Sequence, residues 1–396
     1  MNVLSLFDGM SCGQQALERA GIKVDKYFAS EIDKYAMQVT MANYPGTIQL
    51  GSVVNVNGKE LPKIDILIGG SPCQSFSFAG KRKGMSTKDE QEILTLEHYL
   101  ELKAEGFEFE GQSYLFWEYM RLLDEVKPKY FLLENVMMGE KWEKILSKAI
   151  GVKPIMINSS LISAQNRQRL YWTNIGLEPQ GLFGDLESII ELPKDKGILL
   201  KDILENKVEQ KYFLSDKMIN GFLSHNKRHI EEKNQTGFNW KPTEGNKKAA
   251  CLRANAALFP TDNTIITHNL QRRSADRPSL KENKNAGGSG HLSKSDGKTY
   301  CLDIGNTQAI EIVDGDFRYD EGFRWRDGGK TGTLCTNAES YAKIDSKIRR
   351  LTPVECERLQ TVKDNYTNHV SDSQRYKMLG NGWTVDVIVH ILNYIK

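Results

Sequence analysis

Short apolar runs alternate with amphipathic patterns through about the first 175 residues, and this alternation constrains the fold more than any other feature of the chain. The apolar runs predict strands at 3–7, 27–30, 64–68, 130–133, 155–159 and 170–173. Apolar residues three or four apart predict helices at about 14–20, 33–43, 113–126 and 141–149. Helical crossovers between strands are typical of an α/β fold, so we expect a Rossmann-like, mostly parallel sheet.

The alternation stops near residue 176 and returns near residue 349. The intervening segment is rich in Asn, Lys, Gly and Ser. Thr352-Pro353-Val354-Glu355 then has the pattern of a capped helix start, and an apolar stripe at 385–392 predicts a last helix that packs on the sheet. We therefore expect a discontinuous sheet domain, 1–175 plus 349–396, with an irregular domain inserted at 176–348.

Charge and cysteine content bear on the binding partners and the cellular compartment of the protein. The net charge of +2 neither requires nor excludes a polyanionic partner, but basic residues outnumber acidic ones about two to one between 225 and 298. Such a patch is typical of nucleic-acid binding, and a solvated surface is the alternative. Six cysteines without a C-x-x-C pair, and the lack of an export signal or a spanning segment, predict a cytoplasmic protein with no metal site and no membrane contact.

A glycine turn follows the first strand, in Phe7-Asp8-Gly9-Met10-Ser11-Cys12-Gly13. Glu31 ends the second strand about 20 residues later, where a carboxylate accepts hydrogen bonds from ribose hydroxyls. A plain tight turn is the alternative. Because the pyrophosphate-binding pattern G-x-G-x-x-G is incomplete, the turn favours an adenosine ligand such as S-adenosyl-L-methionine over NAD.

Three further groups follow strands of the predicted sheet. Cys73, after Ser71-Pro72, is either an inert core thiol or a nucleophile whose thiolate is favoured by the basic run at 81–83. That run opens a long polar connection, 80–111, of the kind that forms lids and binding loops. Glu134 is either a buried ion-pair partner or an acid that donates to a ring nitrogen. Arg167 and Arg169 project from one face of an extended segment and converge on one anion or carbonyl, unless they are ordinary surface arginines.

Together these motifs resemble those of the DNA (cytosine-5)-methyltransferases, in variants similar to the de novo type and to related phage and bacterial enzymes. The agreement covers about 1–175 and 349–396 and runs in the same order: Phe7 to Gly13, Glu31, Gly70-Ser71-Pro72-Cys73-Gln74, Glu134-Asn135-Val136, Gln165-Asn166-Arg167-Gln168-Arg169 and Gly380-Asn381-Gly382-Trp383. One departure is Gly51-Ser52, where many relatives carry Gly-Asp to bind adenine. Asp65 or backbone groups are the expected substitutes.

The resemblance implies methyl transfer from S-adenosyl-L-methionine to C5 of a cytosine flipped out of duplex DNA, with S-adenosyl-L-homocysteine as product. Cys73 would attack C6, Glu134 would hold N3, Arg169 would hold O2, and Arg167 would support the site. The implied cofactor-binding residues are Phe7, Asp8, Gly9, Gly13, Glu31, Ile32, Asp65, Pro72, Asn381 and Trp383. The implied DNA-binding residues are Gln74, Ser75, Lys81, Arg82, Lys83 and Gln165.

The resemblance also implies double-stranded DNA as partner, a monomer on DNA, and base reading by the inserted domain, with a cognate restriction endonuclease as a further partner. Two other functions share this fold. One is cytosine-5 methylation of transfer RNA, which the large insertion disfavours. The other is a silent DNA-binding regulator, which the intact Cys73, Glu134 and Arg169 disfavour.

Overall fold

The computed structural model describes residues 1–72, 92–109, 111–180, 185–230, 242–243, 247–252, 264–267, 315–318, 322–325, 340–341 and 347–396. The chain divides into two compact units. The sheet unit comprises 1–205, 248–262 and 352–396, and the inserted unit comprises 206–247 and 263–351. The sheet unit therefore also takes up 176–205 and 248–262. The recognition role of the inserted part stays a prediction.

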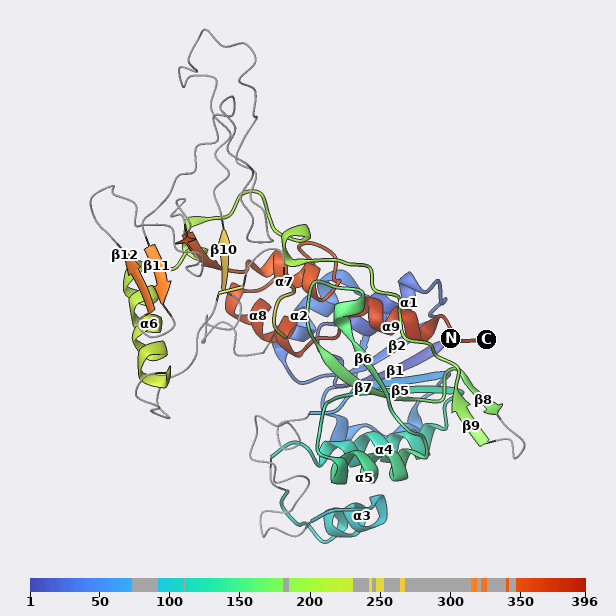
Figure 1. Cartoon of the computed structure of the whole chain (residues 1–396). Helices are drawn as coiled ribbons and strands as arrows, with labels where there is room; N and C mark the ends of the chain where they lie inside the picture. Colours follow the sequence, from blue (N-terminus) through green and yellow to red (C-terminus); the bar gives the residue numbers. More distant parts are fainter. Residues whose placement is uncertain are drawn as a thin grey trace. The chain divides into compact units, whose positions relative to one another are not determined.

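A seven-stranded sheet organises the sheet unit (Figure 1). Its strands run, in spatial order, β3 (Ile48–Gln49), β2 (Lys26–Ser30), β1 (Asn2–Leu6), β4 (Ile66–Gly70), β5 (Tyr130–Val136), β7 (Gln168–Thr173) and β6 (Ile155–Asn158). The first five strands in this order are parallel, and β7 is antiparallel to both its neighbours. The expectation of a mostly parallel α/β sheet is confirmed.

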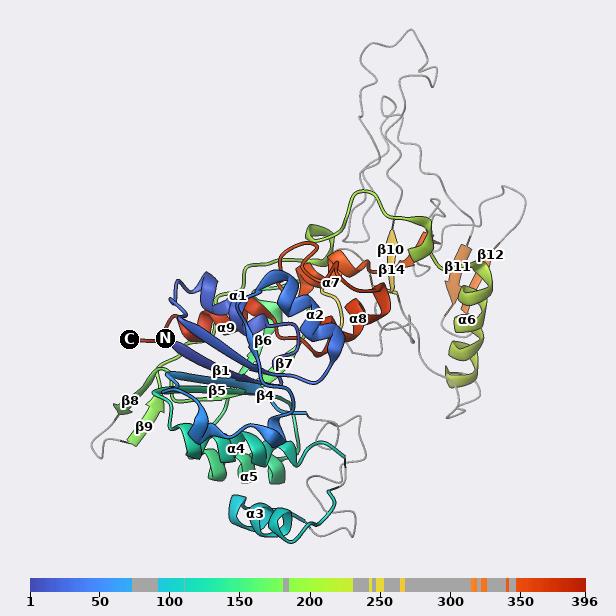
Figure 2. The same cartoon turned by 180° about the vertical axis from the view of Figure 1, so that it is seen from behind.

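Helices cover both faces of this sheet. Figures 1 and 2 place α4 and α5 on one face and α1, α2 and α9 on the other, with the two chain termini close together. The helices of this unit are α1 (Cys12–Arg19), α2 (Lys34–Asn43), α3 (Leu96–Ala104), α4 (Leu115–Val126), α5 (Glu140–Ile150), α7 (Pro353–Leu359), α8 (Asp372–Asn381) and α9 (Val385–Leu392). The last helix, α9, packs against α1, as the apolar stripe predicted.

Local sequence explains where these elements begin. The apolar run of β4 is buried along almost its whole length, as a strand between two other strands requires. The Asp33 carboxylate accepts from the backbone N–H of Tyr35 at 2.9 Å and so caps α2. Thr352 and Glu355 form the expected capping box at the start of α7. One expectation was wrong in part, because helix α3 lies inside the connection 80–111 and buries Tyr99 and Leu102 in the core.

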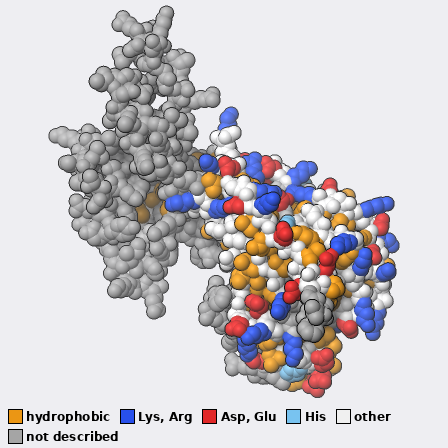
Figure 3. All heavy atoms as spheres, turned by 45° about the vertical axis from the view of Figure 1, so that its right-hand side comes forward, with side chains coloured by type: hydrophobic (Ala, Val, Ile, Leu, Met, Phe, Trp, Pro, Cys, Tyr) orange, Lys and Arg blue, Asp and Glu red, His pale blue; other side chains and the backbone are white. Residues whose placement is uncertain are grey.

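Shorter elements complete the sheet unit. Strand β8 (Leu177–Gln180) pairs antiparallel with β9 (Asp185–Ser188). Four turns of 3-10 helix lie at η1 (Val53–Asn55), η2 (Gly58–Glu60), η3 (Ser159–Leu161) and η4 (Leu200–Asp202). Figure 3 shows Lys and Arg side chains mixed with Asp and Glu over the described part of one face, in keeping with the small net charge. Within the described residues, no helix is long and apolar enough to cross a membrane.

The inserted unit contains one long helix and short antiparallel strands among its described residues. The helix is α6 (Asp216–Ile230), and η5 (Gln210–Tyr212) precedes it. Strand β10 (Thr264–Thr267) pairs with β14 (Lys347–Arg350), and β11 (Gly315–Arg318) pairs with β12 (Gly322–Trp325) and β13 (Ser340–Tyr341).

Candidate active site

Three residues of the turn between β1 and α1 have backbone φ angles in the left-handed region. Phe7, Gly9 and Ser11 have φ values of 56°, 58° and 58°. The Asp8 carboxylate lies beneath the turn, where it accepts from the Tyr27 hydroxyl at 2.7 Å and from the Ser11 hydroxyl. Burial raises the pKa of Asp8 to about 6, although these hydrogen bonds oppose the shift. The turn therefore contains a carboxyl group that titrates near neutral pH.

Gly13 allows α1 to lie close to the sheet. A Cβ atom at this position would stand 2.8 Å from the Tyr27 hydroxyl oxygen and would overlap the Ile68 side chain on β4. Only a residue without a side chain fits this approach. This steric requirement concerns the packing of α1 on the sheet, and the cofactor contact of Gly13 stays a prediction.

Glu31 ties the second strand to this turn. One carboxylate oxygen accepts from the backbone N–H of Gly9 at 2.8 Å. The other accepts from the N–H groups of Ile32 and Asp33 at 2.7 and 2.8 Å. Next to it, the Ile32 side chain is 70% exposed. The structure therefore brings Phe7, Asp8, Gly9, Glu31 and Ile32 together at one edge of the sheet.

The neighbouring strand β4 ends at the same edge, at Gly70. Asn135, at the carboxyl end of β5, donates from Nδ2 to the hydroxyl oxygen of Ser71 at 3.0 Å and fixes the chain that leads to Pro72. Ser71 is buried and Pro72 is half-buried. The predicted residues that come next, Cys73, Gln74, Ser75, Lys81, Arg82 and Lys83, lie outside the described residues.

Glu134 and Arg169 form an ion pair at this edge. Nε of Arg169 lies 2.8 Å from Oε1 of Glu134, and the two side chains are 14% and 11% exposed. Burial is the largest single influence on the pKa of Arg169 and lowers it, but Glu134, Cys251 and Tyr171 together outweigh burial, so the net shift is upward. The other oxygen of Glu134 and the indole Nε1 of Trp383 lie 3.0 and 2.9 Å from the position of a Cβ on Gly70. Gly70 thus lets Trp383 and the carboxylate approach each other.

Arg167 directly precedes β7, the strand that carries Arg169, and has a different role. Its guanidinium, 3% exposed, donates to the carbonyl oxygens of Gly380, Gly382 and Leu252 at 2.9 to 3.2 Å. Burial, followed by the like charge of Arg169, lowers its pKa. Arg167 therefore holds the chain that leads to Trp383, and its side chain is already engaged within the protein.

Two predicted site residues are placed elsewhere. Asp65 lies before β4, at the opposite, amino-terminal edge of the sheet, where its carboxylate accepts from the N–H of Asn2 at 2.8 Å. Gln165 is 0% exposed, and its amide bonds to Leu252, Leu359 and Gln360. We therefore no longer assign Asp65 to the cofactor or Gln165 to DNA. Asn381, the last residue of α8, is exposed beside Trp383.

The sequence patterns missed one contributor to this edge. Cys251 places its sulfur 3.3 Å from Nη1 of Arg167 and 3.8 Å from Nη2 of Arg169. It is 82 positions from Arg169 along the chain and follows no periodic element, so no spacing could have indicated the contact. The described residues contain no group of three His, Cys, Asp or Glu side chains arranged to hold a metal ion.

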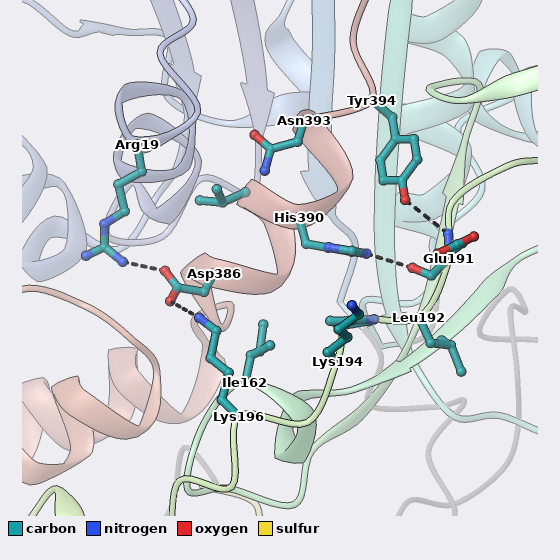
Figure 4. Close-up of a pocket in the computed structure, with 12 residues that line it drawn as sticks. Arg19, Ile162, Glu191, Leu192, Lys194, Lys196, Asp386, His390, Asn393 and Tyr394 are labelled. Carbon is teal, nitrogen blue, oxygen red and sulfur yellow. Dashed lines mark hydrogen bonds and ion pairs between the residues drawn. The ribbon is translucent and has the colours of Figure 1, made fainter.

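A separate cavity of about 490 Å³ contains none of the predicted site residues (Figure 4). It lies between the end of α1, α9 and the segment 191–196. His390 bonds to the backbone carbonyl of Glu191 at 2.7 Å, and Asp386 pairs with Arg19 at 2.8 Å. Its polar groups are largely paired with one another, so we attach no chemistry to it.

Comparisons with known proteins identify the family. The family model described as C-5 cytosine-specific DNA methylase matches residues 1–396. The orphan methyltransferase M.SPRI of Bacillus phage SPR is 27% identical over 99% of this chain and 96% of its own length. The type II methyltransferase M.HgiCI of Herpetosiphon aurantiacus is 26% identical over 97% and 94%.

Two solved structures share the fold. A Spodoptera frugiperda DNMT2 mutant has a TM-score of 0.56 at 19% identity and covers 99% of this chain and 98% of its own. The Entamoeba histolytica methyltransferase EhMeth has a TM-score of 0.58 at 14% identity, with coverage of 100% and 97%. At these identities the likeness concerns the fold alone.

Proposed function

The chain belongs to the C-5 cytosine-specific DNA methylase family, and we propose that it transfers a methyl group from S-adenosyl-L-methionine to C5 of a cytosine in duplex DNA. The observation that carries this proposal is the Glu134–Arg169 pair at 2.8 Å, set beside Gly70, Ser71 and Trp383 at the sheet edge that also bears the Glu31 turn. An acid and a fixed guanidinium side by side match the N3 and O2 edge of cytosine.

The reaction requires a nucleophile because C5 of cytosine is unreactive until another atom adds at C6. In our proposal, the Cys73 thiolate forms a bond to C6, Glu134 carries a proton that it donates to N3 to offset the charge that develops on the ring, and Arg169 binds O2. C5 then forms a bond to the methyl carbon that the sulfonium donor supplies, and S-adenosyl-L-homocysteine leaves. A base, solvent water in our proposal, then removes the C5 proton; the electron pair of the C–H bond forms the C5–C6 double bond, and the Cys73 thiolate leaves C6, which restores the aromatic ring.

The cofactor would lie against the turn between β1 and α1. Backbone N–H groups occupy three of the about four acceptor sites of the Glu31 carboxylate, so the oxygen that accepts only from Gly9 keeps capacity for a ribose hydroxyl. The exposed Ile32 side chain gives the adenine ring an apolar surface. Phe7, Asp8, Gly9, Pro72, Asn381 and Trp383 would complete the pocket. No metal takes part in the proposed chemistry.

The target base must leave the duplex to reach Glu134, at a cost of a few kcal/mol. We propose that Gln74, Ser75, Lys81, Arg82 and Lys83 contact the DNA and that the inserted unit reads the bases. We further propose that the enzyme acts as a monomer on double-stranded DNA in the cytoplasm, with a cognate restriction endonuclease as the partner that its type II relatives suggest.

Replacement of the nucleophile tests this function directly. Cys73→Ser should lower methyl transfer to duplex DNA by at least about a thousandfold, since nucleophile removal in enzymes with covalent intermediates has effects of this order. With S-adenosyl-L-methionine present, a duplex that contains 5-fluorocytosine should give a covalent adduct with the wild type that survives denaturation, because the fluorine that replaces the C5 proton cannot leave after methyl transfer. The adduct should be absent from Cys73→Ser and present in Cys356→Ala, a buried cysteine on α7.

Retained methyl transfer by Cys73→Ser would refute the nucleophile assignment. Methylation of transfer RNA in place of duplex DNA would refute the substrate. Bisulfite sequencing of DNA from cells that express the protein would identify the bases around the target cytosine.

A further inference from the structure

A short segment from the middle of the chain, Lys248–Leu252, runs alongside the Gln165–Arg169 motif. The backbone of Ala249 forms two hydrogen bonds with this part of the chain. The Ala249 N–H donates to the carbonyl of Ala164 at 2.7 Å, and the Ala249 carbonyl accepts from the N–H of Asn166 at 2.9 Å. The N–H of Leu252 donates to the Gln165 side chain at 2.8 Å. These bonds make the segment a part of the sheet unit, although the sequence alone placed it in the inserted domain.

Lys248 fixes the first end of this segment. Its ammonium group donates to three backbone carbonyls, those of Ser160, Ser163 and Ile198, the last two at 3.2 and 2.9 Å. The side chain is only 17% exposed. A lysine that donates to three carbonyls has all three of its donors occupied, so it acts here as an anchor.

Cys251 lies at the other end, between the two arginines of the motif. Its sulfur is 3.3 Å from Nη1 of Arg167, whose guanidinium is already fixed by Gly380 and Gly382. It is also 3.8 Å from Nη2 of Arg169, whose Nε pairs with Glu134. The sulfur thus links an immobile guanidinium to the one that faces the proposed base site.

We propose that Lys248–Leu252 is a positioning element of the active site and that Cys251 is the positioning residue that holds Arg169 in line with Glu134. Nε of Arg169 pairs with Glu134, and Nη1 donates to the backbone carbonyl of the adjacent Gln168 at 2.8 Å. The sulfur accepts from Nη2, so Cys251 is the partner of the third guanidinium nitrogen and ties this arginine to the anchored segment. Since small displacements of groups that hold a reacting base cost large factors in rate, the expected effect is on the chemical step.

This inference rests on the proposed function, and its test measures the chemical step itself. With the full-length enzyme in excess over a duplex substrate, the single-turnover rate of methyl transfer should fall about tenfold in Cys251→Ala, while the KM for S-adenosyl-L-methionine stays within about twofold. Cys251→Ser should keep at least about half of the wild-type rate, because a hydroxyl oxygen also accepts from a guanidinium.

Two further variants separate positioning from loss of packing. Lys248→Met removes the anchor without contact to either arginine and should slow the same step about fivefold. Cys356→Ala, which deletes the same sulfur at a buried position on α7, should leave the rate unchanged.

A wild-type rate in Cys251→Ala, or equal losses in the Ala and Ser variants, would overturn the inference. If Cys251→Ala does not fold, a wild-type rate in Lys248→Met would overturn it instead. A wild-type protein without any methyl transfer to DNA would contradict the proposed function.

Discussion

Arg167 offers the sharpest test of how the site is built. The sequence motif places it beside Arg169 as a second site arginine, whereas in the structure its guanidinium binds backbone carbonyls of the chain that leads to Trp383. Nη1 and Nη2 of its guanidinium both donate to the Gly380 carbonyl. Nη2 also donates to the Gly382 carbonyl, and Nη1 to the Leu252 carbonyl. Arg167→Met keeps most of the apolar stem and deletes every one of these bonds. The variant therefore isolates the cost of leaving the carbonyls without their donors.

The magnitude follows from the partners that remain. The Gly382 carbonyl keeps a bond from Gln360 at 3.2 Å, and that of Leu252 keeps a weak contact with the Cys251 thiol at 3.5 Å. The Gly380 carbonyl loses both of its side-chain donors. Hydrogen bonds from charged groups contribute about 1.5–3 kcal/mol each, and removal of a buried guanidinium recovers part of its desolvation cost, so we expect a net loss of about 3 kcal/mol.

Urea unfolding followed by tryptophan fluorescence measures this loss. Arg19→Met is the matched control: Arg19 donates to one carbonyl and pairs with Asp386, but it is 35% exposed, so its removal should cost below about 1 kcal/mol. Arg167→Met should also weaken S-adenosyl-L-methionine binding, because the chain that it releases leads to Trp383. An unfolding free energy within about 1 kcal/mol of the wild type, together with unchanged cofactor affinity, would refute this account of Arg167.

Two other predictions concern the turn between β1 and α1. Folding raises the pKa of Asp8 to about 6, so the folded protein binds this proton more tightly than the unfolded chain, and the resulting stability is present at acid pH and lost as the pH rises through 6. Between pH 5 and 7, the unfolding free energy of the wild type should therefore fall by about 1 kcal/mol relative to Asp8→Asn, in urea titrations of both proteins; a constant difference would exclude the shift. Glu31→Ala should weaken cofactor binding at least about tenfold in calorimetry, since it removes both the ribose acceptor and the bond to Gly9; unchanged affinity would remove Glu31 from the pocket.

The elements with a clear period could be predicted from the sequence. The apolar run before Gly70 and the helix that ends near Val126 are continuous signals, and both elements form close to the predicted bounds. The capping box at Thr352 is likewise a local pattern. Such features depend on neighbours a few residues away, which a single sequence displays.

Contacts between segments that are far apart in the sequence were harder to predict. The motif Gln165–Arg169 indicates two arginines on one face, but only the folded chain distinguishes the buried Arg167 from the ion-paired Arg169. Asp65 was assigned to the cofactor as a substitute for a missing carboxylate, although its place before a strand puts it at the opposite edge of the sheet. The end of the strand on which a residue lies is thus a better guide than its chemical type.

The contact between α1 and α9 has a consequence for synthesis of the protein. Arg19 and Asp386, which join these helices, are 367 positions apart. At translation rates of about 5–20 residues per second, α1 waits about 20–70 s for its partner after it leaves the ribosome. During this time its apolar face has no α9 to cover it, so this face stays open to other contacts until α9 has been made.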